Sequence, residues 1–261
     1  MKKHKSERAG TTEIFGVNPV LEALRARRRP IQEIIIATGT KDARLAQLVE
    51  LARAQGVPVR NEPRPNLDRI TGNAAHQGIV ARVEAAGYAD AYDLLESIGA
   101  RVGTTPQPLV LVLDGVEDPH NLGAILRTAE CARVDGVFVP ERRAVGLTET
   151  VAKASAGAIE YVPVARATNL SRLIDQLKER NVWVVGTAAD AETNYTDWDW
   201  TRASAIVIGG EGSGLHRLVR EHCDAIVRIP VLGEIESLNV SVATAVILYE
   251  ALRQRAADSK S

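Results

Sequence analysis

The 261-residue sequence is poor in cysteine and in aromatic residues, and it has no long apolar run. Its only cysteines are Cys131 and Cys223, which excludes a disulfide-stabilised scaffold. It has no Cys-x-x-Cys pair and five scattered histidines, so we expect no metal site. No apolar stretch approaches the roughly 18 residues that span a bilayer, and none follows the basic start as in a secretory signal. These absences predict a cytoplasmic protein without a membrane partner.

The formal net charge is −1, but the charge is unevenly distributed. Residues 1–29 hold eight Lys or Arg and only three Glu. This basic front end either attracts a polyanion or is a solubilising tail followed by a solvated helix end, and charge alone leaves both interpretations open. Aromatic residues make up only 4% of the chain, so platforms for stacking bases are scarce. A polyanion bound by such a surface would then be recognised by its shape and charge and not by stacking along an extended single strand.

The first third of the chain has the pattern of a small α/β domain. After a basic tail at 1–11, the range 12–85 alternates short apolar runs with helical periodicity. A helix is expected to start at Asn18-Pro19, with Asn18 as its cap, and another is expected over 41–55. Glycines and prolines mark 86–107 as a linker around a short helical piece.

The range 108–256 alternates clearly between strands and helices, and 257–261 form a tail. Continuous apolar strands between helices predict a parallel sheet with helices on both faces. Such a sheet binds its ligand beyond the carboxyl ends of its strands, here after Leu113, Gly186, Ile208 and Ile229. The expected strands are 109–113, 136–139, 159–164, 182–186, 204–208 and 225–229, and the expected helices are 121–134, 148–156, 169–180, 215–222 and 239–255.

The loop after the first of these strands leads into a helix whose buried stripe is formed by Leu122, Ile125, Leu126 and Ala129. Arg127 lies about 140° around the helix from Leu122, which belongs to the buried stripe, so its side chain points away from the core. Taken alone, such an arginine is more often merely solvated. Asn121, at the start of the helix, is likewise consistent with a helix cap that has no further role.

A glycine-rich loop, Gly209-Gly210-Glu211-Gly212-Ser213-Gly214, follows the strand at 204–208. Its spacing is not G-x-G-x-x-G, and the Glu211 carboxylate would repel a pyrophosphate, so a neutral or cationic ligand fits better. The last loop, 229–239, precedes a helix that is apolar nearly all round. That helix must be buried inside the domain or against a partner subunit, and Ser237 or Asn239 would cap it.

Together these segments resemble a known family. "LDGVEDPHNLGAILRTAECARVDGVFVP", "IVIGGEGSGL" and "IPVLGEIESLNVSVATAVILYEALRQR" are similar to the three signature motifs of the SpoU/TrmH ribose 2′-O-methyltransferases of the SPOUT class. "IFGVNPVLEAL" and "HQGIVARV" resemble the substrate-binding domain of the RlmB-type members, which modify a guanosine of 23S ribosomal RNA.

The resemblance implies properties that composition and periodicity do not. It implies S-adenosylmethionine as cofactor, a C-terminal trefoil knot in which the chain after Ile229 is threaded through a loop, and an L30e-like front domain. It also implies a homodimer formed through the knot region and the C-terminal helix. General topology rules would have excluded the knot.

The resemblance also assigns roles to individual residues. It places Gly209, Ile229 and Leu238 around the adenosine of the cofactor, joined by Thr187 and Leu232. It implies polar roles for Asn121, Arg127, Glu211, Ser237 and Asn239. Because a guanidinium stays protonated in proteins, we expect Arg127 to hold the target phosphate and not to act as a base. RNA contacts are expected from Arg25, Arg27, Arg28, Arg29 and the loop containing His76 and Gln77.

The sequence leaves three alternative functions open. One is a tRNA 2′-O-methyltransferase of the same family. Another is a non-catalytic RNA-binding or ribosome-assembly protein, which the intact polar residues of the motifs disfavour. The third is a nicotinamide dehydrogenase, suggested by the α/β alternation alone. It is disfavoured because Asp114-Gly115-Val116-Glu117 stands where a G-x-G-x-x-G loop would be needed.

Overall fold

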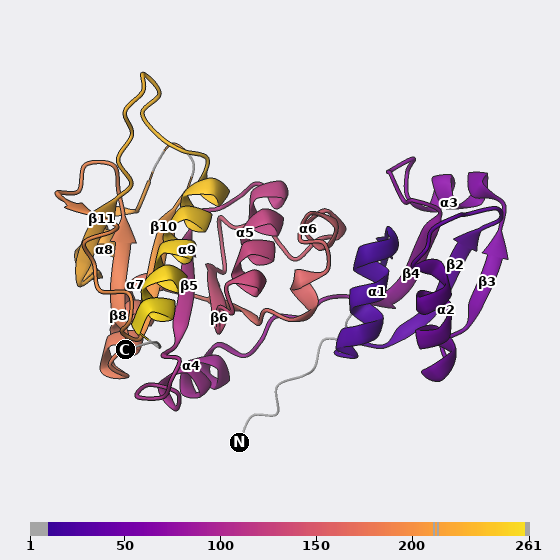
Figure 1. The fold of residues 1–261 in the computed structure, drawn as a ribbon, viewed down its shortest axis with the longest axis horizontal. Coiled ribbons are helices and arrows are strands. Elements are labelled where there is room, and N and C mark those ends of the chain that lie inside the picture. The colour runs from indigo at the N-terminus through magenta and orange to yellow at the C-terminus, as the bar shows by residue number, and fades with distance from the viewer. Residues whose placement is uncertain (1–9, 211, 213, 259–261) are drawn as a thin grey trace. The chain divides into compact units, whose positions relative to one another are not determined.

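The computed structural model describes residues 10–210, 212 and 214–258. The chain forms two compact units, drawn together in Figure 1. The first contains Met1–Gly87 and Leu147–Tyr161, and the second contains Tyr88–Gly146 and Val162–Ser261. Each unit has its own sheet and its own buried core.

The first unit is built on a four-stranded mixed sheet in the order β1-β4-β2-β3. β4 pairs antiparallel with both β1 and β2, whereas β2 and β3 are parallel. α1 and α2 pack on one face of this sheet and α3 on the other. The elements are β1 (Thr11–Phe15), α1 (Val17–Ala26), β2 (Ile31–Ala37), α2 (Leu45–Ala54), β3 (Val59–Glu62), α3 (Arg64–Ile70) and β4 (Ile79–Glu84).

A segment from the middle of the chain completes the first unit. It carries α6 (Glu149–Ala154) and a 3₁₀ turn, η1 (Ala158–Glu160). Ala152 is buried in the same core as α1 and α2, and the Tyr161 hydroxyl donates to the Glu22 carboxylate at 2.6 Å. The strand expected over 159–164 is therefore wrong. Its first residues form η1 in the first unit, and the strand begins only at Val164 in the second.

The second unit is a seven-stranded sheet in the order β7-β6-β5-β10-β8-β11-β9, and all of its strand pairs are parallel. The expected parallel sheet is thus confirmed. The elements are α4 (Ala91–Gly99), β5 (Leu109–Asp114), α5 (Pro119–Cys131), β6 (Gly136–Pro140), β7 (Val164–Ala167), α7 (Leu170–Glu179), β8 (Trp183–Thr187), β9 (Thr193–Asn194), β10 (Ser204–Gly209), α8 (Arg217–His222), β11 (Ala225–Arg228) and α9 (Val240–Asp258).

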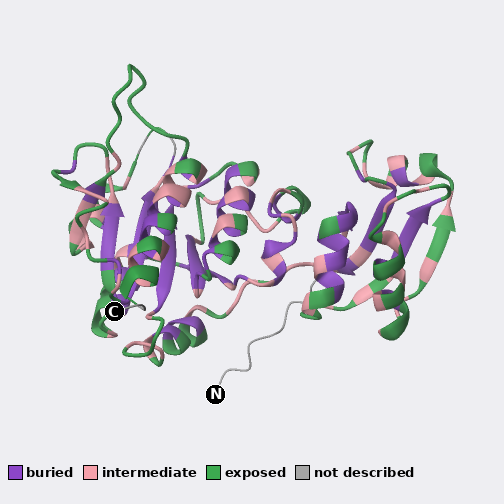
Figure 2. Cartoon of the chain, in the orientation of Figure 1, coloured by how far each residue is buried: buried purple, intermediate pink, exposed green. Residues whose placement is uncertain are grey.

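Helices cover both faces of this sheet, so β5 is buried along its whole length and the other central strands are mostly buried (Figure 2). α5 and α9 lie side by side on one face, where α9 contacts β10 (Figure 1). α4, α7 and α8 pack on the opposite face, where they share one core with Val110, Phe138 and Val207. Strands that are apolar on both sides are what this two-faced burial requires.

Two expectations about the first unit need correction. α1 begins at Val17 after Gly16, whose φ is 96°, so Asn18 lies inside the helix and does not cap it. β1 was not expected, although the Thr, Ile and Phe residues of Thr11–Phe15 favour strands. It forms because its residues pair antiparallel with β4, from Thr11 opposite Glu84 to Phe15 opposite Val80.

The two cysteines lie in different environments and should differ in reactivity. Burial raises the pKa of the Cys223 thiol to about 12, whereas Cys131 is exposed at the end of α5. At pH 8 only about one Cys223 in 10⁴ would be a thiolate, which is the form that reacts. We expect iodoacetamide to alkylate Cys131 and to spare Cys223 in the native protein, as read by peptide mass spectrometry. Equal labelling of both would contradict the buried position of Cys223.

Candidate functional site

The carboxyl ends of β5, β10, β8 and β11 lie at one edge of the second sheet. Gly209, the last residue of β10, is in register with Asp114, the last residue of β5. On the other side of β10, Thr187 at the end of β8 pairs with Val227 of β11. The loops after these strands therefore start beside one another, as the strand–helix alternation predicted.

The glycine-rich loop after β10 packs tightly against its neighbours. A β-carbon at Gly209 would lie 2.2 Å from the carbonyl carbon of Gly214, so the loop folds back on its own start. A β-carbon at Gly210 would lie 2.4 Å from the carbonyl oxygen of Gly115, in the loop after β5. Glycine is thus required at both positions for close backbone approach. Glu211, expected to act in this loop, lies outside the described residues.

Asp114 fastens the exit of this loop to β5. Its buried carboxylate accepts a hydrogen bond from the backbone N–H of His216 at 2.8 Å and lies 2.9 Å from His216 Nδ1. His216 directly precedes α8. Our sequence reasoning missed both residues. An aspartate closing the otherwise apolar run LVLVLD was the available signal, because a buried carboxylate needs hydrogen-bonding partners.

The first turn of α5 and the end of the loop before α9 meet through two asparagines. Asn239 Nδ2 donates to Asn121 Oδ1 at 3.0 Å, although 118 positions separate them in the chain. Asn239 Oδ1 accepts from the backbone N–H and the hydroxyl of Ser241, so Asn239 also caps α9. α5 is capped instead by Asp118, which leaves the Asn121 side chain available for this contact.

Arg127 lies on the solvent side of α5, as the helical spacing predicted. The buried residues of this helix include Leu122, Ile125 and Leu126, and Arg127 is exposed. Within the described part of the chain it forms no ion pair. Its guanidinium is therefore able to take a phosphate of a bound ligand.

The loop 229–239 exposes aliphatic side chains close to this edge. Leu232 is 99% exposed and Ile235 77%, and Leu238 is also exposed. Ile229 is half-buried just after β11, and Ser237 is exposed in the same loop. This loop supplies apolar and hydroxyl groups that no described residue covers.

The RNA-contacting residues expected in the first unit lie in three kinds of environment. Arg27 and Arg28 are exposed, and Arg25 is exposed but paired with Glu22. Three others are engaged internally: Arg29 with Glu160 and the Glu84 carbonyl, His76 with Asp68 and the Gly78 N–H, and Gln77 with the Val17 N–H at the start of α1.

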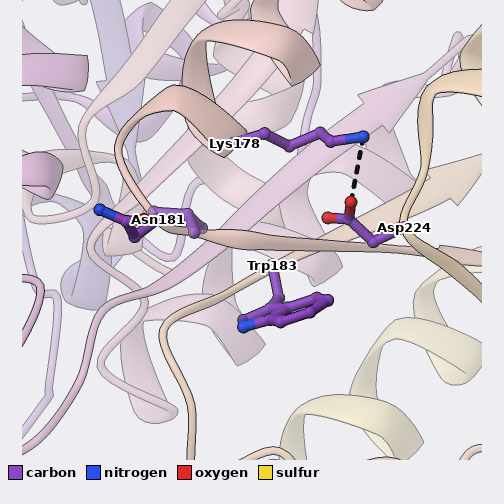
Figure 3. A pocket seen from close by; sticks show the side chains of 5 residues that line it. Lys178, Asn181, Trp183 and Asp224 are labelled. Atoms are coloured by element: carbon purple, nitrogen blue, oxygen red, sulfur yellow. Dashed lines mark ion pairs between the residues drawn. The ribbon is translucent and has the colours of Figure 1, made fainter.

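A shallow pocket of about 240 Å³ lies at the other edge of the second sheet (Figure 3). Trp183 begins β8 and Asp224 directly precedes β11, so the pocket is at the amino ends of the strands. Lys178 and Asp224 form an ion pair of 3.0 Å beside the Trp183 ring (Figure 3). The pocket is therefore separate from the edge where the loops meet.

The described residues include no group of three or more His, Cys, Asp or Glu placed to hold a metal ion. Among the same residues, no helix is both long and apolar enough to cross a membrane.

Comparison with known proteins assigns both parts of the chain. Residues 108–249 match the model of the SpoU rRNA Methylase family, and residues 14–89 match that of the RNA 2'-O ribose methyltransferase substrate binding domain. A putative TrmH family tRNA/rRNA methyltransferase of Bacillus subtilis is 45% identical over 243 residues, covering 93% of this chain and 95% of the relative.

Two further proteins are similar along nearly the whole chain. The 23S rRNA (guanosine-2'-O-)-methyltransferase RlmB of Xylella fastidiosa is 43% identical over 242 residues, covering 93% of this chain and 96% of the relative. The solved SpoU methyltransferase AviRb of Streptomyces viridochromogenes, in complex with AdoMet, has a TM-score of 0.76 at 26% identity and covers 98% of this chain and 95% of its own. The chain belongs to the SpoU rRNA methylase family.

Proposed function

We propose that this protein transfers the methyl group of S-adenosylmethionine to the ribose 2′-hydroxyl of a guanosine in 23S ribosomal RNA. The observation that carries the proposal is the convergence of three sequence-distant loops at one sheet edge. The Asn121–Asn239 hydrogen bond joins two of them, and the packing of Gly210 on Gly115 joins the third. The full-length similarity to RlmB supports the choice of RNA.

The residues at this edge fit S-adenosylmethionine. The cofactor carries no phosphate, and the glycine-rich loop offers backbone groups without a basic side chain. Gly209, Thr187 and Ile229 stand at the ends of neighbouring strands and would hold the adenosine, with Leu232 and Leu238 covering it. When bound, the cofactor supplies a methyl carbon that is electrophilic because it is attached to a sulfonium.

The protein's own polar groups then act on the RNA. Arg127 holds the phosphate next to the target ribose and stabilises negative charge that develops on the 2′-oxygen. Ser237 and Asn239 position the ribose or relay its proton, and Asn121 fixes the Asn239 amide. Glu211 orients an arginine, which we place in the second subunit. With the cofactor bound, Ser237 or Asn239 would pass the 2′-hydroxyl proton to solvent while the 2′-oxygen takes the methyl group, whose bond to sulfur would break to leave S-adenosylhomocysteine.

The assembly that we propose is a homodimer formed through the loop 229–239 and α9. The exposed apolar side chains in these segments support it, because a symmetric interface needs a self-complementary apolar patch. Those of the loop and the helix are Val231, Leu232, Ile235, Leu238, Val242 and Tyr249. The trefoil knot and the L30e-like character of the first unit stay predictions. A cytoplasmic location belongs to the same proposal, since ribosomal RNA is its substrate.

The RNA target can be tested directly. Ribosomal RNA and tRNA from a strain lacking the gene would each be incubated with the protein and labelled S-adenosylmethionine, and the methylated nucleotide located by mass spectrometry. We expect one ribose methyl in 23S ribosomal RNA that is absent from the deletion strain. Methylation confined to tRNA would favour the tRNA alternative. No binding of S-adenosylmethionine by calorimetry would favour a non-catalytic RNA-binding protein.

Changing Asn239 to serine separates its two roles. Serine caps helices about as well as asparagine, so Asn239→Ser should keep the cap of α9 and lose only the hydrogen bond to Asn121. It cannot reach Asn121 with an amide, so we expect methyl transfer to fall about tenfold or more, measured as incorporated label. Asn239→Ala should lose the same activity and be about 1 kcal/mol less stable than Asn239→Ser, because it also loses the cap. Full activity of Asn239→Ser would contradict a role for the Asn121–Asn239 link.

A further inference from the structure

The loop after β6 carries two adjacent arginines that the fold itself does not use. Arg142 and Arg143 are both exposed. In the described part of the chain, neither forms an ion pair or a side-chain hydrogen bond. Most other arginines of the second unit do: Arg180, Arg202, Arg217 and Arg220 are each paired with a carboxylate. Two neighbouring unpaired guanidiniums therefore form a local positive centre.

This loop lies at the same sheet edge as the candidate site. Val112 of β5 is in register with Phe138 of β6, which places Pro140, the end of β6, level with Asp114. The loop then contacts the connection after β5, because the Val145 N–H donates to the Val116 carbonyl at 3.3 Å. The connection after β5 thus has the glycine-rich loop on one side, at Gly115, and the arginine-bearing loop on the other.

The charges and side chains around the loop 141–146 indicate which class of ligand it would bind. Glu141 and Glu149 are the exposed carboxylates nearest in sequence, and neither is bonded to Arg142 or Arg143. The loop 141–146 contains no aromatic residue on which a base would stack. A guanidinium presents a planar fork of donors that matches the oxygens of a phosphate. The loop is therefore suited to a nucleic-acid backbone and not to reading bases.

We propose that Arg142 and Arg143 bind backbone phosphates of the RNA substrate beyond the one that Arg127 holds next to the target ribose. The inference rests on the proposed function, and it adds a phosphate-binding site in the second unit to the basic surface of the first. These two arginines hold the RNA, while Arg127 on α5 acts at the reacting ribose.

The chain offers a matched control in Arg133. It is also exposed, it forms no ion pair with a described residue, and its φ of 53° is close to the 57° of Arg143. It lies between the end of α5 and the start of β6, at the opposite, amino edge of the sheet. Arg133→Ala thus removes the same charge from the same backbone conformation but far from the proposed site.

The test measures binding of transcribed 23S ribosomal RNA over a series of salt concentrations. We expect Arg142→Ala/Arg143→Ala to weaken binding about tenfold at physiological salt. The slope of log K against log salt should become shallower by about 1.4–1.8, as for two lost phosphate contacts. Arg142→Lys/Arg143→Lys should restore the slope, because both charges remain. The affinity for S-adenosylmethionine should equal that of the wild type.

Other outcomes would overturn the proposal. A slope for the double alanine variant equal to that of Arg133→Ala would show that no phosphate is held there. A matching loss of S-adenosylmethionine affinity would show that the loop shapes the cofactor pocket instead. Failure of the proposed function is distinguishable, because the wild-type protein itself would then methylate no RNA.

Discussion

Replacing Arg127 by alanine should reduce methyl transfer about 100- to 1000-fold while leaving the affinity for S-adenosylmethionine unchanged. The side chain is exposed on α5, so its loss opens no cavity and should change stability by less than about 0.5 kcal/mol. The activity loss follows because a donor aimed at developing charge contributes about 3–4 kcal/mol to the transition state. Single-turnover incorporation of labelled methyl groups would measure it.

A lysine at position 127 keeps the charge but loses the planar fork of donors. Arg127→Lys should therefore recover part of the activity, and Arg133→Ala should behave as the wild type. If Arg127→Ala folds, binds the cofactor and methylates RNA at the wild-type rate, the role assigned to Arg127 is wrong. Equal losses in Arg127→Ala and Arg133→Ala would point to general electrostatics and not to a position beside the ribose.

The parallel sheet and the meeting of its loops were predictable from local pattern. Runs such as LVLVL at 109–113 are apolar on both sides. This pattern is needed only in a sheet that is covered by helices on two faces. Once the strands are parallel, their carboxyl ends must share one edge, so the loops containing Asn121, Gly209 and Asn239 were expected together. Helical spacing also placed Arg127 on the solvent side of its helix, as observed.

Features that depend on long-range contacts were not predictable in the same way. Thr11–Phe15 becomes a strand because β4 pairs with it, and the segment 158–160 joins the first unit because its side chains pack there. The Asp114–His216 contact joins residues 102 positions apart. The periodicity of apolar residues describes local structure and does not predict such a long-range pair.

The exposure of basic residues was not predictable from the sequence either. A run of arginines at 25–29 indicates positive charge, but not which guanidinium faces solvent. Arg29 turns inward to Glu160, whereas Arg28 is exposed. The backbone direction at the end of α1 makes this distinction, since Arg27 adopts a left-handed conformation with φ 52°. Charge counting therefore overestimates the surface available to RNA.

Glu160→Gln should destabilise the first unit by about 3–5 kcal/mol, because it leaves the Arg29 guanidinium buried without a counter-charge. Arg29 is 9% exposed and Glu160 4%. Arg29 Nε donates to both carboxylate oxygens at 3.0–3.1 Å, and Nη1 donates to the Glu84 carbonyl at 2.8 Å. The pair thus ties the mid-chain segment to the sheet of the first unit. Calorimetry should show one transition moved down by more than about 10 °C.

A double variant distinguishes the cost of an unpaired charge from general loss of packing. Arg29→Met/Glu160→Leu replaces both partners with apolar groups, and it should be less destabilised than Glu160→Gln although it alters more atoms. The exposed pair Arg217–Glu221 serves as a control, because Glu221→Gln removes an ion pair that water already screens and should change stability by less than about 0.5 kcal/mol. If Glu160→Gln unfolds no earlier than Glu221→Gln, the buried ion pair does not hold the mid-chain segment, and the apolar contacts of Ala152 in the core must do so instead.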